Sequence, residues 1–192
     1  MRSRVRGFAH CAVLGLAGVL AVPAARAAVE PQLCFGCHGE NGNSTNPAVP
    51  SLSAQPAQFI ATQLIMFREK RRNDPLMSPI AAPLTNAEIS ALGKFFTAQP
   101  RATPAKKPSE EVVAAGRRIT EQYNCVACHG AALKGQQHIP RLAGQQADYL
   151  RTQLRGFKAG TRFDMDGNMT AAAQPLAAGD IDVLAEYLST LE

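Results

Sequence analysis

The sequence carries the stretch Cys34-Phe35-Gly36-Cys37-His38 and repeats its pattern as Cys125-Val126-Ala127-Cys128-His129. Each stretch is C-x-x-C-H, the attachment signature of a c-type haem. Two cysteines at this spacing can reach the two vinyl groups of one porphyrin and form thioethers, and the adjacent histidine then lies under the iron. The pattern therefore predicts two haem c groups, covalently attached through Cys34, Cys37, Cys125 and Cys128, with His38 and His129 as axial iron ligands.

The two signatures belong to a longer internal repeat. Residues of the first half recur in the second at offsets of 90 to 92 positions, and the pairs include Pro50/Pro140, Gln55/Gln145, Gln63/Gln153, Met77/Met169 and Leu84/Leu176. A segment rich in proline and lysine separates the halves, as expected of a stiff polar linker. We expect a signal peptide over 1–27, a first haem-binding domain over 28–98, a linker over 99–108 and a second haem-binding domain over 109–192.

Within each half, the spacing of capping and apolar residues indicates helices. Thr85 and Glu88 form a T-x-x-E capping box ahead of apolar residues at i, i+3, i+7 spacing, and the second half keeps that spacing from Ile181 to Leu188. Ser109 is placed to cap one more helix over 110–120, and no alternating β pattern competes. The predicted fold class is all-α, with two tandem helical domains, each a small bundle around one covalently bound haem.

The first 27 residues have the layout of a secretory signal. Three arginines precede an apolar run over 11–22, and Ala25-Arg26-Ala27 supplies small residues for cleavage after Ala27. The apolar run is too short for a membrane span, which needs roughly 20 residues, although an uncleaved anchor is the alternative. Cleavage would remove Cys11 and four arginines, lowering the formal charge from +5 to +1. The sequence therefore predicts a periplasmic protein and no binding to nucleic acid.

Other uses of the cysteines fit the sequence less well. A zinc site would have to join cysteine pairs 91 residues apart, whereas the usual gap is roughly 12 to 20 residues. A C-x-x-C redox motif would need a βαβ context, which the sequence lacks. Two structural disulfides would leave the adjacent histidines unexplained.

Methionine sulfur is a common sixth ligand in electron-carrying cytochromes, where it raises the reduction potential. Met77 lies 39 residues after His38 and Met169 lies 40 residues after His129, and each is followed seven residues later by a leucine. We predict that Met77 and Met169 are axial iron ligands. Met165 competes for the second iron, while Met66 fits core filling.

Three further residues are candidates for supporting roles. A ligating imidazole usually donates its other N–H to an oxygen, and the backbone carbonyls of Pro50 and Pro140 are suitably placed after the two histidines. A plain turn proline is the alternative. His138 has no counterpart in the first half, so a solvated loop histidine is favoured over a ligand.

The chain resembles the dihaem cytochrome c4 family. The likeness covers 33–191 and lies in the paired C-x-x-C-H-G units, each followed by a proline-bearing loop, a Q-x-x-(F/Y)-(I/L)-x-x-Q-L helix, a methionine loop and a closing helix. It implies two class I cytochrome c folds, His/Met ligation at both irons, and periplasmic electron transfer toward a terminal oxidase or a similar acceptor. The first half departs from the family pattern, because too few residues precede Cys34 for a packed opening helix.

These observations predict a soluble periplasmic one-electron carrier and not an enzyme. The alternative is the cytochrome subunit of a periplasmic or membrane-associated dehydrogenase or peroxidase-type enzyme. The expected partners are redox proteins, namely a respiratory donor complex and a terminal oxidase-type acceptor. A monomer is expected, and peripheral membrane association stays open. Basic residues at 68–72 and 151–162 fit a solvated face or charge near haem propionates, with docking to an acidic partner as the alternative.

Overall fold

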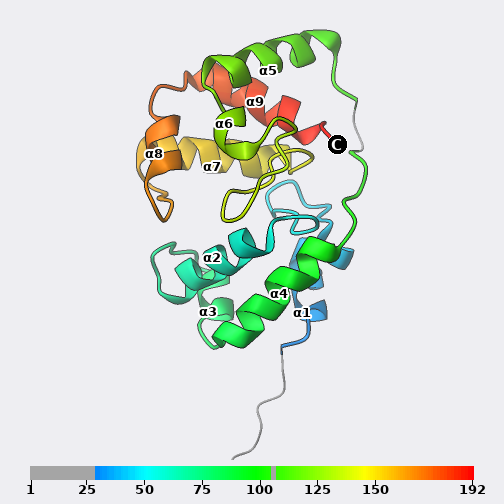
Figure 1. Cartoon of the computed structure of the whole chain (residues 1–192), viewed down its shortest axis with the longest axis vertical. Coiled ribbons are helices and arrows are strands. Elements are labelled where there is room, and N and C mark those ends of the chain that lie inside the picture. Colours follow the sequence, from blue (N-terminus) through cyan, green and yellow to red (C-terminus); the bar gives the residue numbers. More distant parts are fainter. Residues whose placement is uncertain (1–28, 105–106) are drawn as a thin grey trace, which may run out of the picture.

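The computed structural model describes residues 29–104 and 107–192. The helices, in order, are α1 (Gln32–His38), the 3₁₀ helix η1 (Glu40–Gly42), α2 (Ala57–Arg68), α3 (Met77–Ala81), α4 (Asn86–Ala98), α5 (Glu110–Gln122), α6 (Val126–His129), α7 (Ala147–Ala159), α8 (Asn168–Ala173) and α9 (Ala178–Ser189). Figure 1 shows α1–α4 as one helical group and α5–α9 as a second, with the connecting segment along one side. The described residues form no strand, only a single bridge between Gln136 and Ile139. The all-α prediction is confirmed.

The first group is built on α2 and α4, which pack against each other. Helix α4 begins at the predicted capping box: Thr85 accepts a hydrogen bond from the Glu88 amide, and the Glu88 carboxylate accepts one from the Thr85 amide. Such a box satisfies amides that the first turn leaves unpaired. The apolar face that follows is almost fully buried at Ile89, Leu92 and Phe96, and this face forms the core of the group.

The second group repeats this arrangement and adds α5. Helix α9 packs against both α7 and α5, and its residues Ile181, Leu184 and Leu188 are buried in the same spacing as on α4. Helix α5 begins at Ser109, whose hydroxyl accepts a hydrogen bond from the Val112 amide, and it carries two glutamates in its first turn. Acidic residues there favour a helix because they face its positive end. Helix α5 thus covers one side of α9.

Among the described residues, the first group has no counterpart of α5. An aromatic cluster lies in its place: the Phe35 ring centroid is 6.1 Å from that of Phe95 and 6.4 Å from that of Phe96. Phe35 is one of the two residues between the cysteines of the first signature. Its counterpart in the second group, Val126, is exposed, and Tyr187, the counterpart of Phe95 at an offset of 92, lies against Gly116 on α5 instead. The first group therefore replaces a missing helix with a phenylalanine from the signature itself.

The methionine segments differ from the predicted loops. Met77 begins the short helix α3 and Met169 lies in the short helix α8. An aspartate precedes each helix and closes its first turn: Asp74 accepts from the Met77 amide at 2.8 Å, and Asp164 accepts from the Met169 amide at 2.9 Å. Side-chain capping of this kind satisfies backbone amides locally, so the chain coils into a helical turn instead of staying an open loop.

The two groups meet through the loops that follow each signature and through the starts of α2 and α7. The amide of Tyr149 on α7 donates to the carbonyl of Pro47 at 3.0 Å, and the Gln146 side chain donates to the carbonyl of Ser44. Gln55 and Gln145 each bond to backbone of the opposite group. Polar groups line this contact, and most of them have a partner across it.

The predicted signal peptide over 1–27 lies outside the described residues, as does part of the predicted linker. No helix within 29–104 and 107–192 is long and apolar enough to cross a membrane.

Candidate haem sites

The first signature lies on α1, which ends at its histidine. Helix α1 stops because Gly39 adopts φ 79°, and a Cβ at this position would stand 2.0 Å from the Asn43 carbonyl oxygen. A glycine is thus required here by both conformation and space. The turn brings the chain back so that the Nδ1 atom of His38 lies 2.8 Å from the carbonyl oxygen of Pro50.

The second signature has the same geometry. Helix α6 ends at His129, Gly130 adopts φ 79°, and the Nδ1 atom of His129 lies 2.9 Å from the carbonyl oxygen of Pro140. A carbonyl oxygen can only accept, so Nδ1 must carry the ring proton in both histidines. The lone pair on Nε2 is then free, which is the state that an iron ligand needs.

The electrostatics of both histidines favour the neutral ring. Burial lowers the pKa of His38 and of His129, and this outweighs the opposite effect of the hydrogen bonds to Pro50 and Pro140. A neutral imidazole is the form that coordinates a metal. Both rings therefore have the tautomer and the neutral protonation state that an iron ligand requires.

None of the four signature cysteines forms a disulfide within the described residues. Burial raises the pKa of Cys34 and of Cys125, with a smaller contribution from the second cysteine of each pair. Burial therefore disfavours the thiolate, the form that binds zinc or exchanges disulfides. No cluster of three or more potential metal-ligating His, Cys, Asp or Glu side chains exists in 29–104 and 107–192. The raised pKa values weigh against a zinc–thiolate site at either signature.

A narrow apolar cavity lies beside the second signature. Its lining includes Cys125, His129 and Met169 together with Leu142, Leu154, Leu176, Leu184 and Leu188. Met165, the competing methionine, is 48% exposed and does not line this cavity. In the first group, Cys34 and Met77 pack against the corresponding core, which contains Leu84, Leu92 and Phe96. A flat hydrophobic cofactor with sulfur and imidazole ligands matches this set of side chains.

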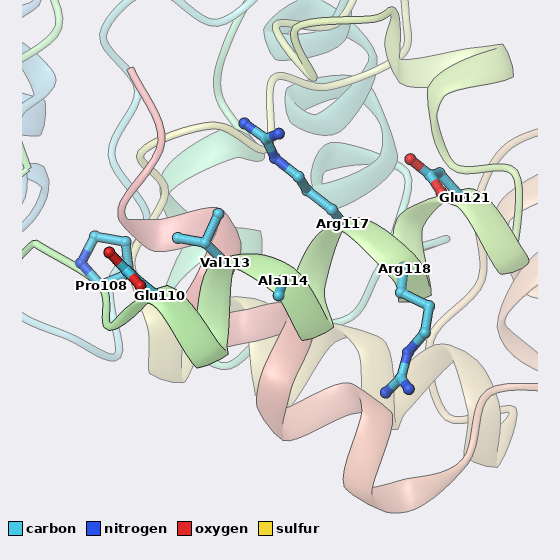
Figure 2. Close-up of a pocket in the computed structure, with 7 residues that line it drawn as sticks. All are labelled: Pro108, Glu110, Val113, Ala114, Arg117, Arg118 and Glu121. Atoms are coloured by element: carbon cyan, nitrogen blue, oxygen red, sulfur yellow. The ribbon is translucent and has the colours of Figure 1, made fainter.

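A second hollow runs along α5 (Figure 2) and has a different character. It is lined by Pro108, Glu110, Val113, Ala114, Arg117, Arg118 and Glu121. Figure 2 shows Arg117 and Arg118 pointing in different directions from the helix. The charges do not converge on a point, and the lining contains no residue of either signature.

The remaining methionine and histidine candidates have ordinary surroundings. Met66 is buried in the last turn of α2, in agreement with core filling. His138 lies on the surface with its Nε2 atom 3.3 Å from Asp166, on a loop beside the methionine segment.

A polar cluster at the contact between the groups was not predicted. Arg72 donates to the Tyr149 hydroxyl at 3.1 Å and to Gln63 at 2.6 Å, while Arg162 donates to Gln153. Burial lowers the pKa of Arg162 to about 10. Its Nε atom is buried and has no hydrogen-bond partner within the described parts of the chain. The repeat gave a signal that could have located this cluster, since Arg72 and Arg162 are 90 positions apart.

The basic runs are largely engaged within the molecule. Arg68 donates to the Leu84 carbonyl, Arg151 and Arg155 both bond to Asp182, and Lys158 donates to the Gln174 carbonyl. Arg72 and Arg162 also bond within the molecule, whereas Lys70 and Arg71 are exposed.

Comparison with known proteins places these features in a family. The cytochrome c family matches residues 113–192. A cytochrome c4 of Thiocapsa roseopersicina is 34% identical over 83% of this chain and 87% of its own length. The thiosulfate dehydrogenase electron acceptor of Thiomonas intermedia (strain K12) is 33% identical over 88% of this chain and 84% of its own length. The solved structure of Acidithiobacillus ferrooxidans cytochrome c4 superposes with a TM-score of 0.76 at 30% identity, over 84% of this chain and all of that one.

The paired signatures, the two helical domains and the similarity over most of the chain agree. The chain is a c-type cytochrome that binds haem c and carries electrons, and it belongs to the cytochrome c4 family.

Proposed function

We propose that this chain binds two haem c groups and carries single electrons between redox proteins in the periplasm. The observation that supports this most directly is the duplication of the histidine geometry. In each half, Nδ1 is tied to a proline carbonyl and Nε2 is left free, next to two free cysteines. The domain boundaries that we propose are 28–98 and 109–192, joined by the linker 99–108 and preceded by a cleaved signal peptide over 1–27.

The proposed ligand sets follow the repeat. Cys34 and Cys37 attach the first haem, with His38 and Met77 as axial ligands. Cys125 and Cys128 attach the second, with His129 and Met169. The haem supplies the one-electron chemistry when bound, while the chain supplies ligands, orientation and a shell that excludes water. Pro50 and Pro140 hold the imidazoles through their carbonyls, and Asp74 and Asp164 hold the backbone of the methionine segments.

The half-buried Arg72 and Arg162 support the presence of an anionic group at the contact between the domains. Arg162 has a buried Nε–H without a partner in the described chain, and Arg72 lies close enough to lower its pKa further. Buried charges are normally paired. Haem propionates are carboxylates, which guanidinium groups bind well, so we propose that Arg72 and Arg162 bind propionates.

The decisive experiment measures the haem content and the near-infrared absorption of the purified protein. We expect a pyridine haemochrome assay to give two haems per chain. We expect the oxidised protein to show the methionine–iron charge-transfer band at the intensity of two sites. One haem per chain, or a band of half intensity, would contradict the proposal for one of the two domains.

The proposed direction of flow runs from a dehydrogenase to a terminal oxidase-type acceptor. The relative from Thiomonas intermedia is named as an electron acceptor of thiosulfate dehydrogenase, and this supports a periplasmic dehydrogenase as the donor. Mixing the oxidised protein with thiosulfate and a thiosulfate dehydrogenase tests it: we expect reduction of both haems. Membranes containing a terminal oxidase should then reoxidise them.

The same relative favours a second candidate, in which the chain is a fixed cytochrome subunit of a dehydrogenase. A free carrier is expected to purify alone as a monomer. A subunit is expected to purify in a stoichiometric complex with the dehydrogenase. Binding of carbon monoxide to the reduced protein tests the peroxidase-type alternative, because two six-coordinate His/Met irons should not bind it readily.

A further inference from the structure

The two domains exchange a matched pair of glutamine contacts. Gln145 of the second domain accepts a hydrogen bond from the Ser51 amide at 2.8 Å and donates one to the Ser51 carbonyl at 2.8 Å. Gln55 of the first domain accepts from the Arg141 amide at 3.0 Å and donates to the Arg141 carbonyl at 2.9 Å. Ser51 and Arg141 are equivalent positions in the repeat, as are the two glutamines. Each glutamine therefore binds the same backbone position of the opposite domain.

These contacts are buried. Ser51 is 2% exposed, Gln55 3% and Gln145 5%. Buried carboxamides and peptide groups must be hydrogen-bonded to avoid a large desolvation cost. Each glutamine carboxamide accepts one hydrogen bond from, and donates another to, the backbone of a single residue. The two hydrogen bonds together fix the orientation of the carboxamide.

The residue that each glutamine binds follows the proline that holds an axial histidine. The Pro50 carbonyl and the Ser51 amide belong to one planar peptide unit. The carbonyl end accepts from His38 Nδ1 at 2.8 Å, and the amide end donates to Gln145. In the same way, the peptide unit of Pro140 and Arg141 joins His129 to Gln55. One peptide group thus lies between each histidine and a glutamine of the other domain.

Hydrogen bonds in such a chain reinforce one another. When an amide N–H donates to an acceptor, the carbonyl of the same peptide becomes a better acceptor. The imidazole N–H bound to that carbonyl is then more strongly polarised, and the ring becomes a more basic ligand. A more basic ligand favours the ferric state and lowers the reduction potential of its iron.

We propose that Gln145 is a positioning residue for His38, and Gln55 a positioning residue for His129, so that each domain helps to set the reduction potential of the other domain's haem. This inference rests on the proposed axial roles of the two histidines. It assigns a function to the contact between the domains: docking completes the hydrogen bonding behind each ligand.

The test is a redox titration of the holoprotein with Gln145→Met and Gln55→Met, a matched pair of substitutions that remove the carboxamide and keep an unbranched side chain. The two steps are first assigned with Met77→His and Met169→His, since loss of a methionine ligand lowers the potential of the affected iron. We expect Gln145→Met to raise the potential of the first haem and Gln55→Met that of the second. The equilibrium constant for electron exchange between the haems should change a few-fold, in opposite directions in the two variants.

A glutamate variant tests whether the hydrogen bond to the peptide amide sets the potential. Further measurements exclude unfolding as the cause of a shift. Gln145→Glu keeps an acceptor for the Ser51 amide, so the potential of the first haem should not rise. Amide hydrogen exchange of the reduced protein gives a readout independent of the irons: Gln145→Met should speed exchange at Ser51 and leave Arg141 protected. Circular dichroism and sedimentation would show whether each variant keeps its helices and its monomeric state.

Several outcomes would overturn the inference. One is that each substitution shifts the potential of the haem in its own domain. A second is an equal shift of both potentials, as simple loosening of the contact would give. A third is no shift despite faster exchange at Ser51. Failure of the proposed ligation would be seen separately, in the unsubstituted protein, as a missing haem or a missing methionine–iron band.

Discussion

Gly116 on α5 lies directly against Tyr187 on α9, so close that a Cβ at position 116 would stand 2.2 Å from the Tyr187 Cγ atom. The nearest atoms are Cγ, Cβ and Cδ1 of Tyr187, where the ring joins the side chain, and not the far end of a flexible side chain. Tyr187 is buried, and the ring has no open space to move into. This close approach is what allows α5 to cover α9.

The first prediction follows from this contact. Gly116→Ala should destabilise the second domain by about 1 to 3 kcal/mol, the usual cost of overpacking, although alanine itself favours a helix over glycine by roughly 1 kcal/mol. Denaturant unfolding followed by circular dichroism measures the change. Gly179→Ala on α9 is the control, because a Cβ there would meet no atom within 4 Å; it should be neutral or stabilising. Equal stability of the two variants would contradict the proposed role of the contact.

The second prediction concerns the phenylalanine that replaces a helix. Phe35→Ala should destabilise the first domain by about 1 to 3 kcal/mol, because the half-buried ring packs against Phe95 and Phe96. The matched change Val126→Ala in the second domain should cost less than about 1 kcal/mol, since Val126 is exposed. Thermal unfolding of the two holoproteins distinguishes them. A larger loss in Val126→Ala would show that Phe35 does not substitute for α5.

The third prediction uses the helix caps, which differ between the domains. Thr85 caps α4, whereas Ala177 at the same place on α9 offers no side-chain acceptor. Thr85→Ala should therefore cost about 1 kcal/mol, and Ala177→Thr should add up to about that amount, because its hydroxyl can accept from a first-turn amide. Urea midpoints report both changes. A destabilised Ala177→Thr variant would mean that the extended backbone at this position does not suit a cap.

The fourth prediction separates the two methionine candidates of the second domain. Met169→Ala should remove the charge-transfer band of one haem, and Met165→Ala should leave it unchanged, because Met165 is exposed and does not line the cavity beside His129. Near-infrared absorption of the oxidised protein measures the band. The reverse pattern would reassign the ligand.

The fifth prediction tests how the methionine segment is held. Asp164 accepts hydrogen bonds from the Met169 and Thr170 amides and from the Thr170 hydroxyl. Burial acts to raise the pKa of Asp164, but the Thr170 hydroxyl, the Asp166 side chain and the two amides together outweigh it and lower the pKa to about 2. Asp164→Ala should loosen Met169, so that added imidazole displaces it at a several-fold lower concentration. Asp182→Ala is the control, since the Asp182 carboxylate on α9 bonds to Arg151 and Arg155 and not to the methionine segment; equal sensitivity in both variants would argue against a specific role.

The haem signatures and the main helices could be predicted because they depend on local sequence. The Thr85–Glu88 capping box and the apolar spacing of α4 and α9 involve residues only a few positions apart. The local sequence pattern was therefore enough to locate these helices. The helical form of the methionine segments was missed. Asp74 and Asp164 supply caps there, but these helices are too short to show a periodic apolar face.

The sequence by itself determined the candidates for the chemistry: the paired C-x-x-C-H signatures, the methionines at matched spacing and the duplication that relates them. The tertiary structure alone decided how the two halves depend on each other. The Gln145 carboxamide reaches a peptide 94 residues away, and the Gln55 carboxamide reaches one 86 residues away. No local pattern encodes such a pairing. It exists because peptide groups buried between two domains must find hydrogen-bond partners, and the opposite domain provides them.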